Sequence, residues 1–368
     1  MTDGFWRQPS FRQNPLVRTF SLLAILVATT AAVPDASKSI RWLDFLAAFR
    51  AWLFLGILLI TFEIWAHVEY DSSFFLNPFN VKSIAVFTVT PLLLGLGQTF
   101  VIISGGIDLS VGFTMGLSAV VTAHVFNWGN QFGNPVLSLA LAIFAGLGIA
   151  VVPGVINGLL IADLRVPPFI GTLGMYGVAR GVAYLLARGT TVPVQNGLLG
   201  SIGNGEIAGL PNLVLLTAGI LLVLHYLLSQ TRYGQHIYAI GGNVNAALRA
   251  GINVRNNTIA LYILSSLTAG CAGILYTAKF SAGAAQAGEP VLLDSIAAVV
   301  IGGASLFGGS GTVVGTIIGA LIIAVIQYGL VFVNVEPFWQ FVAVGVVIII
   351  SVLVDQIQKQ VGRDGPNG

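Results

Sequence analysis

The sequence predicts an all-α integral membrane protein, a polytopic helical bundle of about ten transmembrane helices, some of them broken or re-entrant. Three observations lead to this fold class. Hydrophobic residues make up 56% of the 368-residue chain and charged residues 8%, and the mean hydropathy is +0.89; soluble domains have about 25% charged residues. The apolar runs are continuous, which favours helices over the alternating strands of a membrane barrel. The 45 glycines suit helices that pack closely in a bilayer.

The apolar runs give the order of the expected spans. A helix needs about 20 residues to cross the roughly 30 Å hydrocarbon core. Ten runs approach or reach this length: 49–68, 83–104, 107–126, 135–156, 168–187, 212–229, 257–279, 291–306, 312–333 and 338–354. The runs 107–126 and 291–306 are short or interrupted by glycine, so we expect these two to be broken or re-entrant.

The chain divides into three parts on this basis. Residues 1–48 form an N-terminal cytoplasmic or interfacial extension, residues 49–356 the transmembrane domain, and residues 357–368 a cytoplasmic tail. The run 19–33 follows three arginines and ends in small residues, as a signal peptide does. At fifteen residues it is short for a span, so an interfacial or partly inserted helix is favoured over a cleaved leader.

The positive charges predict the orientation, because cytoplasmic loops carry an excess of lysine and arginine. With a cytoplasmic N-terminus, twelve such residues lie inside: Arg7, Arg12, Arg18, Lys38, Arg41, Arg50, Arg165, Arg232, Arg249, Arg255, Lys359 and Arg363. Three lie outside: Lys82, Arg188 and Lys279. Both termini are therefore expected in the cytoplasm.

One long polar segment, TRYGQHIYAIGGNVNAALRAGINVRNN at residues 231–257, then also faces the cytoplasm. Asn243 or Asn245 can cap a short helix over 246–250, and Gly251 can supply the left-handed residue that ends it. So short a helix is unstable alone in water. It must rest either on the rest of this chain or on a soluble partner; a solvated loop with one capped turn is the simpler alternative.

Three of the charged residues within or beside the apolar runs are candidates for a specific role in the membrane. Asp108, in SGGIDLSVG, lies either near a transport path or at the start of the next helix, capping it through the amides of Ser110 and Val111. Arg180 is an intramembrane charge that can pair with a carboxylate or cap a neighbouring helix. Asp294 is open to the same two interpretations as Asp108.

Four segments together resemble one known family. They are GQTFVIISGGIDLSVG (97–112), NGLLIADLRVPPFIGTLGMYGVARG (157–181), YGQHIYAIGGNVNAALRAGINV (233–254) and LDSIAAVVIGGASLFGGSGTVVGTIIGALI (293–322). In this order and spacing they are similar to permease subunits of ATP-binding-cassette importers of the ribose, xylose and galactose type. The similar region runs from about residue 50 to 355, and the N-terminal extension departs from the pattern.

The resemblance implies a division of labour in a bacterial inner membrane. Two permease subunits, identical or related, form the path; two cytoplasmic ATPase subunits bind ATP and Mg²⁺ and drive it; and an extracytoplasmic binding protein delivers the sugar. This chain would bind no cofactor and catalyse no reaction. Residues of 231–256 would form the coupling loop to the ATPase: Tyr233, Gly234, Gly241, Gly242, Asn243, Arg249 and Gly251.

A path for a neutral sugar or polyol needs a few amides and hydroxyls and some aromatic walls. Polar residues within the apolar runs, together with Phe169, supply candidates for the path or its gate: Gln98, Ser104, Asp108, Asn157, Phe169, Thr172, Asp294 and Gln327. Two further motifs stay open. GGASLFGGSG at 302–311 is a flexible break that hints at an internal duplication of SGGIDLSVG. Gly315 and Gly319 form a close-packing face, for a second permease or for an internal contact.

Other classes fit the sequence less well. The chain lacks the G-x-x-x-x-G-K-[ST] loop of ATPases and has no clustered Cys, His and carboxylate residues for a metal. A net charge of +2 gives no reason to expect a nucleic-acid partner, and the single Cys271 gives no disulfide framework. A membrane enzyme would need convergent acid–base groups. An ion-coupled secondary transporter is the main alternative, and it would work without an ATPase.

Overall fold

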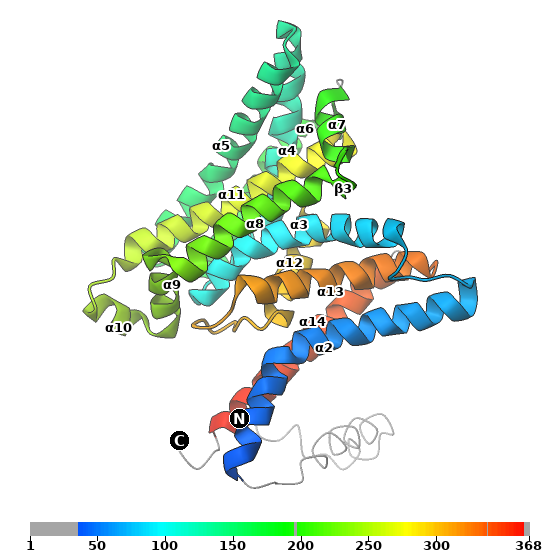
Figure 1. Ribbon diagram of the computed structural model, residues 1–368. Coiled ribbons are helices and arrows are strands. Elements are labelled where there is room, and N and C mark those ends of the chain that lie inside the picture. The colour runs from blue at the N-terminus through cyan, green and yellow to red at the C-terminus, as the bar shows by residue number, and fades with distance from the viewer. Residues whose placement is uncertain (1–35, 195–196, 337, 364–368) are drawn as a thin grey trace, which may run out of the picture. The chain divides into compact units, whose positions relative to one another are not determined.

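The computed structural model describes residues 36–194, 197–336 and 338–363. Its helices are α2 Ala36–Tyr70, α3 Pro78–Ile103, α4 Val111–Gly129, η3 Asn130–Phe132, α5 Pro135–Ala162, α6 Pro168–Ala187, α7 Gly197–Asn204, α8 Asn212–Gln230, α9 Arg232–Gly242, α10 Val244–Arg249, α11 Val254–Phe280, α12 Glu289–Ile301, α13 Val313–Phe332 and α14 Phe338–Arg363 (Figure 1). The strands β1 Val192–Pro193, β2 Glu206–Ile207, β3 Leu210–Pro211 and β4 Ala282–Gly283 pair as β1–β4 and β2–β3, both antiparallel.

The chain separates into two compact units, Met1–Arg50 and Ala51–Gly368. Of the first unit, the structure describes only the opening of α2, from Ala36 to Arg50. The apolar run 19–33 lies outside the described residues. The second unit contains all the helices from the remainder of α2 onward.

Seven described helices are long and apolar enough to cross a membrane: residues 51–70 of α2, and α3, α5, α6, α8, α11 and α13. The helical membrane fold is confirmed. The other three expected runs also form helices, but α12 has only 13 residues, α4 falls outside the set of seven, and Phe338–Ile350 of α14 forms a shorter apolar helix. The two runs expected to be broken or re-entrant are thus α4 and α12.

Helix α3 lies at the centre of the second unit. Asn77 caps it by accepting a hydrogen bond from the Phe79 amide (3.0 Å), and Pro78 occupies its first position, which needs no amide hydrogen. Most of the helix is buried against α11, α12 and α13. The Thr99 and Thr316 hydroxyls meet 2.6 Å apart, so α3 and α13 share a polar contact inside an otherwise apolar core.

Small residues bring α4, α5 and α11 together. The Ser118 hydroxyl oxygen lies 3.0 Å from the carbonyl oxygens of both Gly146 on α5 and Gly270 on α11. A side chain at Gly154 would lie 2.7 Å from the Tyr262 carbonyl oxygen. Without a hydrophobic driving force in lipid, such close backbone contact supplies the packing energy.

The glycine pair on α13 makes an internal contact. An added Cβ at Gly315 or Gly319 would overlap the Gly302 or Ala298 carbonyl oxygen on α12. Of the two expected roles for Gly315 and Gly319, the structure therefore supports an internal helix contact rather than a contact with a second permease.

The glycine-rich loops at 104–110 and 302–312 meet each other and α9. The Gly309 amide donates to the Ile103 carbonyl (2.8 Å), and the Tyr238 hydroxyl of α9 donates to the Gly311 carbonyl (2.7 Å). Gly308 and Gly309 have φ values of 86° and 79°, which favour glycine. The first loop separates α3 from α4, and the second separates α12 from α13.

The polar segment forms two helices where we expected one. Asn243, not Asn245, caps α10 by accepting a hydrogen bond from the Ala246 amide (3.0 Å), and Gly251 ends it with φ 78°. The preceding helix α9 was not expected, because its sequence RYGQHIYAIGG contains three glycines. Thr231 caps α9, and buried Ile237 and Ile240 hold it against the bundle.

The close packing of α5 on α11 gives a test with a matched control. Gly154→Leu should destabilise the protein by roughly 1–3 kcal/mol, because the new side chain meets the α11 backbone. Gly148→Leu, on the same helix, should change stability little, since a Cβ there meets no atom within 4 Å. Thermal unfolding in detergent measures both variants. Equal losses would contradict this account of the packing.

Candidate functional site

Asp108 is fully buried between α3 and α4 and accepts three hydrogen bonds. The amide (3.0 Å) and hydroxyl (2.6 Å) of Ser110 donate to its Oδ1, and the Ser265 hydroxyl donates to Oδ2 (2.8 Å). The helix α4 has Ser110, not Asp108, at its N-cap position, and Val111 makes no such bond. The capping interpretation holds only in part. Asp108 accepts a hydrogen bond from the amide of Ser110, the residue just before α4, and its bond with Ser265 also joins the loop to α11.

Three other expected path residues join Asp108. The side-chain amide of Gln98 on α3 donates to the Asp108 main-chain carbonyl, and that of Asn157 on α5 donates to the Ser110 hydroxyl (2.9 Å). The Thr172 hydroxyl on α6 lies 3.3 Å from the Ile107 carbonyl. The loop between α3 and α4 is therefore held by polar side chains from α3, α5, α6 and α11, which we call the Asp108 network.

Two expected path residues lie outside this network. Ser104 ends α3, and its hydroxyl donates to the Val101 carbonyl (2.7 Å), so its role is local. Phe169, in the first turn of α6, is half exposed on the surface of the chain.

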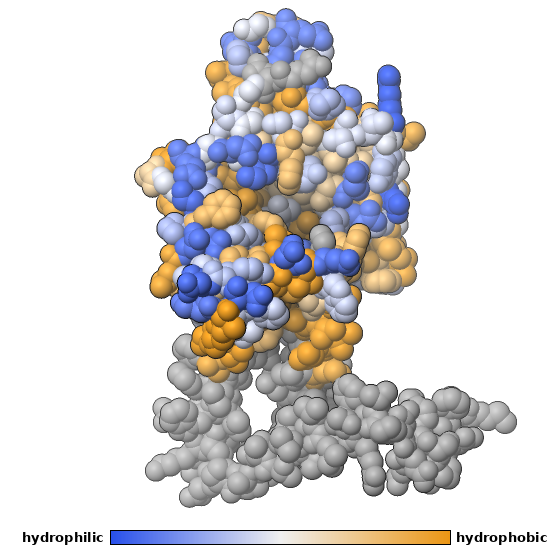
Figure 2. Space-filling model, turned by 90° about the vertical axis from the view of Figure 1, so that its right-hand side faces the viewer, coloured by the Kyte–Doolittle hydropathy of each residue, from blue (hydrophilic) through white to orange (hydrophobic). Residues whose placement is uncertain are grey.

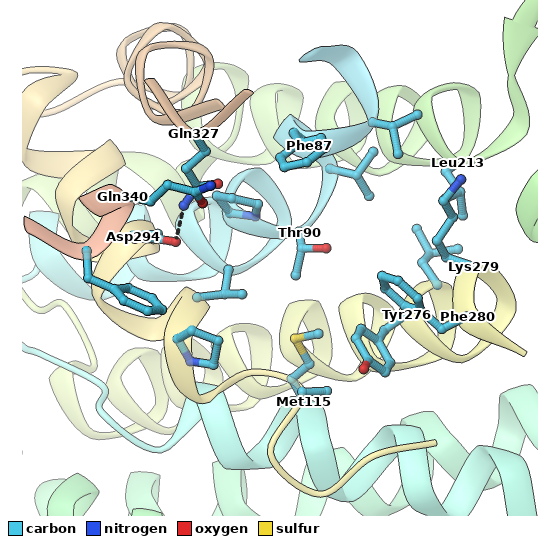
Figure 3. A pocket seen from close by; sticks show the side chains of 18 residues that line it. Phe87, Thr90, Met115, Leu213, Tyr276, Lys279, Phe280, Asp294, Gln327 and Gln340 are labelled. Carbon is cyan, nitrogen blue, oxygen red and sulfur yellow. Dashed lines mark hydrogen bonds between the residues drawn. The ribbon is translucent and has the colours of Figure 1, made fainter. Parts of the chain in front are cut away.

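Asp294 and Gln327 form a second, separate polar group. The Gln327 side-chain amide donates to Asp294 Oδ2 (2.7 Å), and Asp294 is buried (Figure 3). The capping interpretation of Asp294 is wrong. Helix α12 begins five residues earlier at Glu289, with Pro290 in its first turn, so Asp294 lies inside the helix and reaches across to α13.

Asp294 and Gln327 line one end of a cavity of about 500 Å³. Its walls are mostly apolar and aromatic and include Phe87, Tyr276, Phe280 and Phe341, with Thr90, Lys279 and Gln340 as further polar residues (Figure 3). Lys279 and Phe280 end α11 and Leu213 begins α8, so the cavity reaches the end of the bundle that lies at the right of Figure 1. Figure 2 faces this end, where hydrophilic and hydrophobic residues are interspersed.

Arg180, for which we expected either an ion pair or a role in capping a neighbouring helix, makes aromatic contacts. Its guanidinium carbon lies 5.3 Å from the centre of the Phe113 ring and 6.0 Å from that of Tyr184. No carboxylate of the described residues lies within salt-bridge distance of it. This contact was not predictable from the sequence, because Phe113 is 67 positions away on another helix.

The expected coupling residues divide into two groups. Tyr233, Gly234 and Gly241 face the bundle: the Tyr233 ring stacks on Phe100 (6.4 Å), and an added Cβ at Gly234 or Gly241 would overlap the carbonyl oxygen of Leu228 or Ile103. Gly242, Asn243, Arg249 and Gly251 are exposed. The first group fixes α9 to the bundle, and the second lies on the free side of the segment.

An ion pair joins the start of α11, where the polar segment ends, to the end of α5. The Arg255 guanidinium, at the start of α11, donates to both oxygens of Asp163, at the end of α5 (2.5 and 2.8 Å). The Arg255 guanidinium holds the pKa of the Asp163 carboxyl below its usual range. The pair was missed at the sequence level because 92 positions separate its members.

A family model described as the permease component of branched-chain amino acid transport systems matches residues 80–352. The chain belongs to this family. The matched residues take in the Asp108 network, the cavity and α9–α10, so all three lie within the part of the chain that defines the family. Only the segment before residue 80 and the C-terminal tail lie outside the match.

Individual relatives are sugar permeases by name. The chain is 39% identical to the ribose import permease protein of Escherichia coli (strain K12), over 75% of this chain and 85% of the relative. It is 36% identical to the fructose import permease protein of Rhizobium meliloti (76% and 81%) and 33% identical to the galactose/methyl galactoside import permease protein of Escherichia coli (strain K12) (82% and 94%). No solved structure matches the chain significantly.

Two neighbouring buried serines test the Asp108 network. Ser265→Ala removes a donor to Asp108 and should cost about 1 kcal/mol of stability. Ser266→Ala should cost less, because the Ser266 hydroxyl has no hydrogen-bond partner among the described residues. Thermal unfolding in detergent gives the comparison, and a larger loss for Ser266→Ala would rule out this assignment.

The Asp163–Arg255 pair predicts a pH dependence. Because the folded pKa of Asp163 is lowered, its ionised form stabilises the fold at pH values above the ordinary aspartate pKa of about 3.9, and the effect is lost as pH falls through the folded pKa. Asp163→Asn should therefore lower the melting temperature at pH 7, and the difference from the unaltered protein should shrink toward zero below about pH 4. A difference that grew on acidification would contradict the sign.

Proposed function

We propose that this chain is the membrane-spanning subunit of an ATP-driven importer for a monosaccharide or a similar polyol. The observation that carries the proposal is the 33–39% identity, over most of both chains, to permeases named for the import of ribose, fructose and galactose. An importer of this class receives its solute from an extracytoplasmic binding protein and its energy from a separate ATPase. Nothing in the comparisons supports the ion-coupled alternative.

The proposed topology has ten crossings in the inner membrane and cytoplasmic termini. The seven long spans are supplemented by α4, α12 and α14, each of which coincides with an expected apolar run. With this orientation the cavity opens to the outside and α9–α10 lie in the cytoplasm. The excess of positive charge on the α9–α10 side supports the assignment.

We assign different roles in the sugar path to the Asp294–Gln327 pair and to the Asp108 network. The cavity combines aromatic walls with the Asp294–Gln327 pair, which suits a sugar that has an apolar face and several hydroxyls. A hexose fits easily within about 500 Å³. The Asp108 network is closed and buried, so we assign it to the gate: it holds the break between α3 and α4, and its rearrangement would open the route toward the cytoplasm.

Helix α10 is the proposed docking element for the ATPase. Its six residues expose Val244 and Leu248 beside Arg249, with relative exposures of 46% and 55% for the two apolar side chains. A cleft on the ATPase can bury both of them and accept hydrogen bonds from the guanidinium. Reversing a conformational equilibrium from 1:99 to 99:1 takes about 5.5 kcal/mol of differential contact energy, which a small docked helix with these groups can supply.

Uptake by reconstituted vesicles tests the function. Vesicles that contain this chain, its ATPase and its binding protein should accumulate the sugar when ATP is supplied to the ATPase side, and an uncoupler should have no effect. Accumulation that collapses with an uncoupler and continues without ATP would identify an ion-coupled transporter instead. Vesicles with this chain alone should not accumulate sugar.

Copurification tests the docking element. Leu248→Glu or Arg249→Glu should reduce the amount of ATPase subunit recovered with this chain by about tenfold or more, since each places a carboxylate in an apolar or cation-accepting cleft. Leu210→Glu, at an equally exposed leucine in β3 on the opposite side, is the control and should leave recovery unchanged. Full recovery with both α10 variants would refute the assignment.

A further inference from the structure

Arg180 occupies an unusual place for a charged residue. It is the thirteenth of the 20 residues of α6, and it is exposed on the surface of the chain. Every other lysine or arginine in the seven described spans lies within five residues of a helix end. A guanidinium at that depth cannot face hydrocarbon without a large free-energy cost, and such groups face a protein interior or a water-filled cavity.

The contacts of Arg180 leave its hydrogen-bond donors free for another molecule. The guanidinium lies over the Phe113 and Tyr184 rings, which hold it by cation–π attraction and accept no conventional hydrogen bond from it. A guanidinium has five N–H donors. Beside it, the Tyr176 hydroxyl donates to Glu289 Oε1 (3.4 Å), and the edge of the Tyr176 ring meets Phe113 (4.7 Å between centres).

Arg180 belongs to a stripe that runs the length of α6. Phe169, Leu173, Gly177, Arg180 and Tyr184 follow one another at intervals of three or four residues, so they lie on one side of the helix. The first four are exposed and Tyr184 is half-buried. The stripe thus has an aromatic ring near each end of the span and a leucine, a glycine and a guanidinium between them, whereas Val178, Val182 and Leu185 are exposed apolar side chains beside it.

The neighbouring helices provide the comparison. The exposed large side chains in the middle of α5 are Phe144 and Val152, and those of α8 are Leu222 and Val223, all apolar as for lipid-facing helices. Gly148 on α5 and Gly219 on α8 are exposed, and a Cβ added at either meets no atom within 4 Å; the same is true of Gly177 on α6. Gly148 and Gly219 therefore lie on the exposed surfaces of α5 and α8, and Gly177 lies on the α6 stripe.

We propose that the α6 stripe, Phe169, Leu173, Gly177, Arg180 and Tyr184, lines a further stretch of the aqueous path of the sugar, outside the cavity and the Asp108 network, and that Arg180 and the Tyr176–Glu289 pair hydrogen-bond its hydroxyls in transit. The inference rests on the proposed function. The rings suit the apolar face of a pyranose, and the guanidinium and carboxylate supply donors and acceptors that water can replace after the sugar moves on. A neutral solute leaves such a site easily, because no ion pair has to break.

Thiol labelling distinguishes water from lipid along these helices. The chain has one cysteine, so Cys271→Ala gives a cysteine-free background. Gly177→Cys, Gly148→Cys and Gly219→Cys are then introduced singly into the whole transporter in vesicles and treated with a charged, membrane-impermeant methanethiosulfonate. Only a thiolate reacts, and a thiol in hydrocarbon does not ionise. Gly177→Cys should react at least about tenfold faster than both controls, and the transported sugar should slow it.

Two results would overturn the proposal. In the first, Gly177→Cys reacts no faster than Gly148→Cys and Gly219→Cys. In the second, Gly177→Cys resists the reagent but forms a disulfide between two copies of the chain, which identifies a dry interface. If the Cys271→Ala background takes up sugar with ATP while either result is found, only the α6 assignment fails; if the complete system takes up no sugar, the proposed function fails.

Arg180→Gln gives an independent readout. It keeps a hydrogen-bonding side chain and removes the charge, and we expect uptake to fall about tenfold with no loss of assembled transporter or of thermal stability. Normal uptake would contradict a role in the path. Reduced uptake that only tracks a loss of folded transporter would assign Arg180 to packing against Phe113 and contradict the proposal as well.

Discussion

The absence of hydrogen-bonding partners in hydrocarbon is the constraint on which the rest of this structure depends. Every polar group in the spans must find a partner inside the protein or face water. Several threonine and serine hydroxyls in the spans bond to carbonyls one turn earlier, as Thr88 and Thr217 do, or join two helices, as Ser118 does. The Ser266 hydroxyl is an exception among the described residues. The same constraint makes Asp108 and Arg180 informative: the first is enclosed by three donors, and the second keeps its donors directed outward.

Features encoded locally were predictable from the sequence. Each of the ten apolar runs coincides with a described helix, because length and apolar composition within one segment decide whether it can cross a bilayer. The end of α10 was likewise predicted at Gly251, since a left-handed residue and a cap involve only a few neighbouring positions. Features that depend on distant pairing were not: Asp294 bonds Gln327 across 33 positions, Arg180 lies over Phe113, and α9 is helical through buried isoleucines despite its glycines.

The grouping of the candidate site residues shows the same division. Polarity within apolar runs selected Gln98, Asp108, Asn157 and Thr172, and the structure brings these four to one loop. Polarity alone could not separate them from Asp294 and Gln327, which line a cavity elsewhere. Through the Gly309–Ile103 and Tyr238–Gly311 bonds, the polar loop at the end of α3 is also connected to α9. A movement of α9 can therefore be transmitted, through these two hydrogen bonds and the loop residues between them, to the break between α3 and α4.

The exposed leucine and valine of α10 have a consequence for biogenesis. If α10 docks on a cytosolic ATPase as proposed, a subunit that has entered the membrane before meeting that partner presents Leu248 and Val244 to water on a helix of only six residues. Solvent-exposed apolar side chains on a marginal helix are a substrate for chaperones and proteases. Orphan copies would then be degraded preferentially, and the cell would keep the two kinds of subunit in balanced amounts without regulating their synthesis separately.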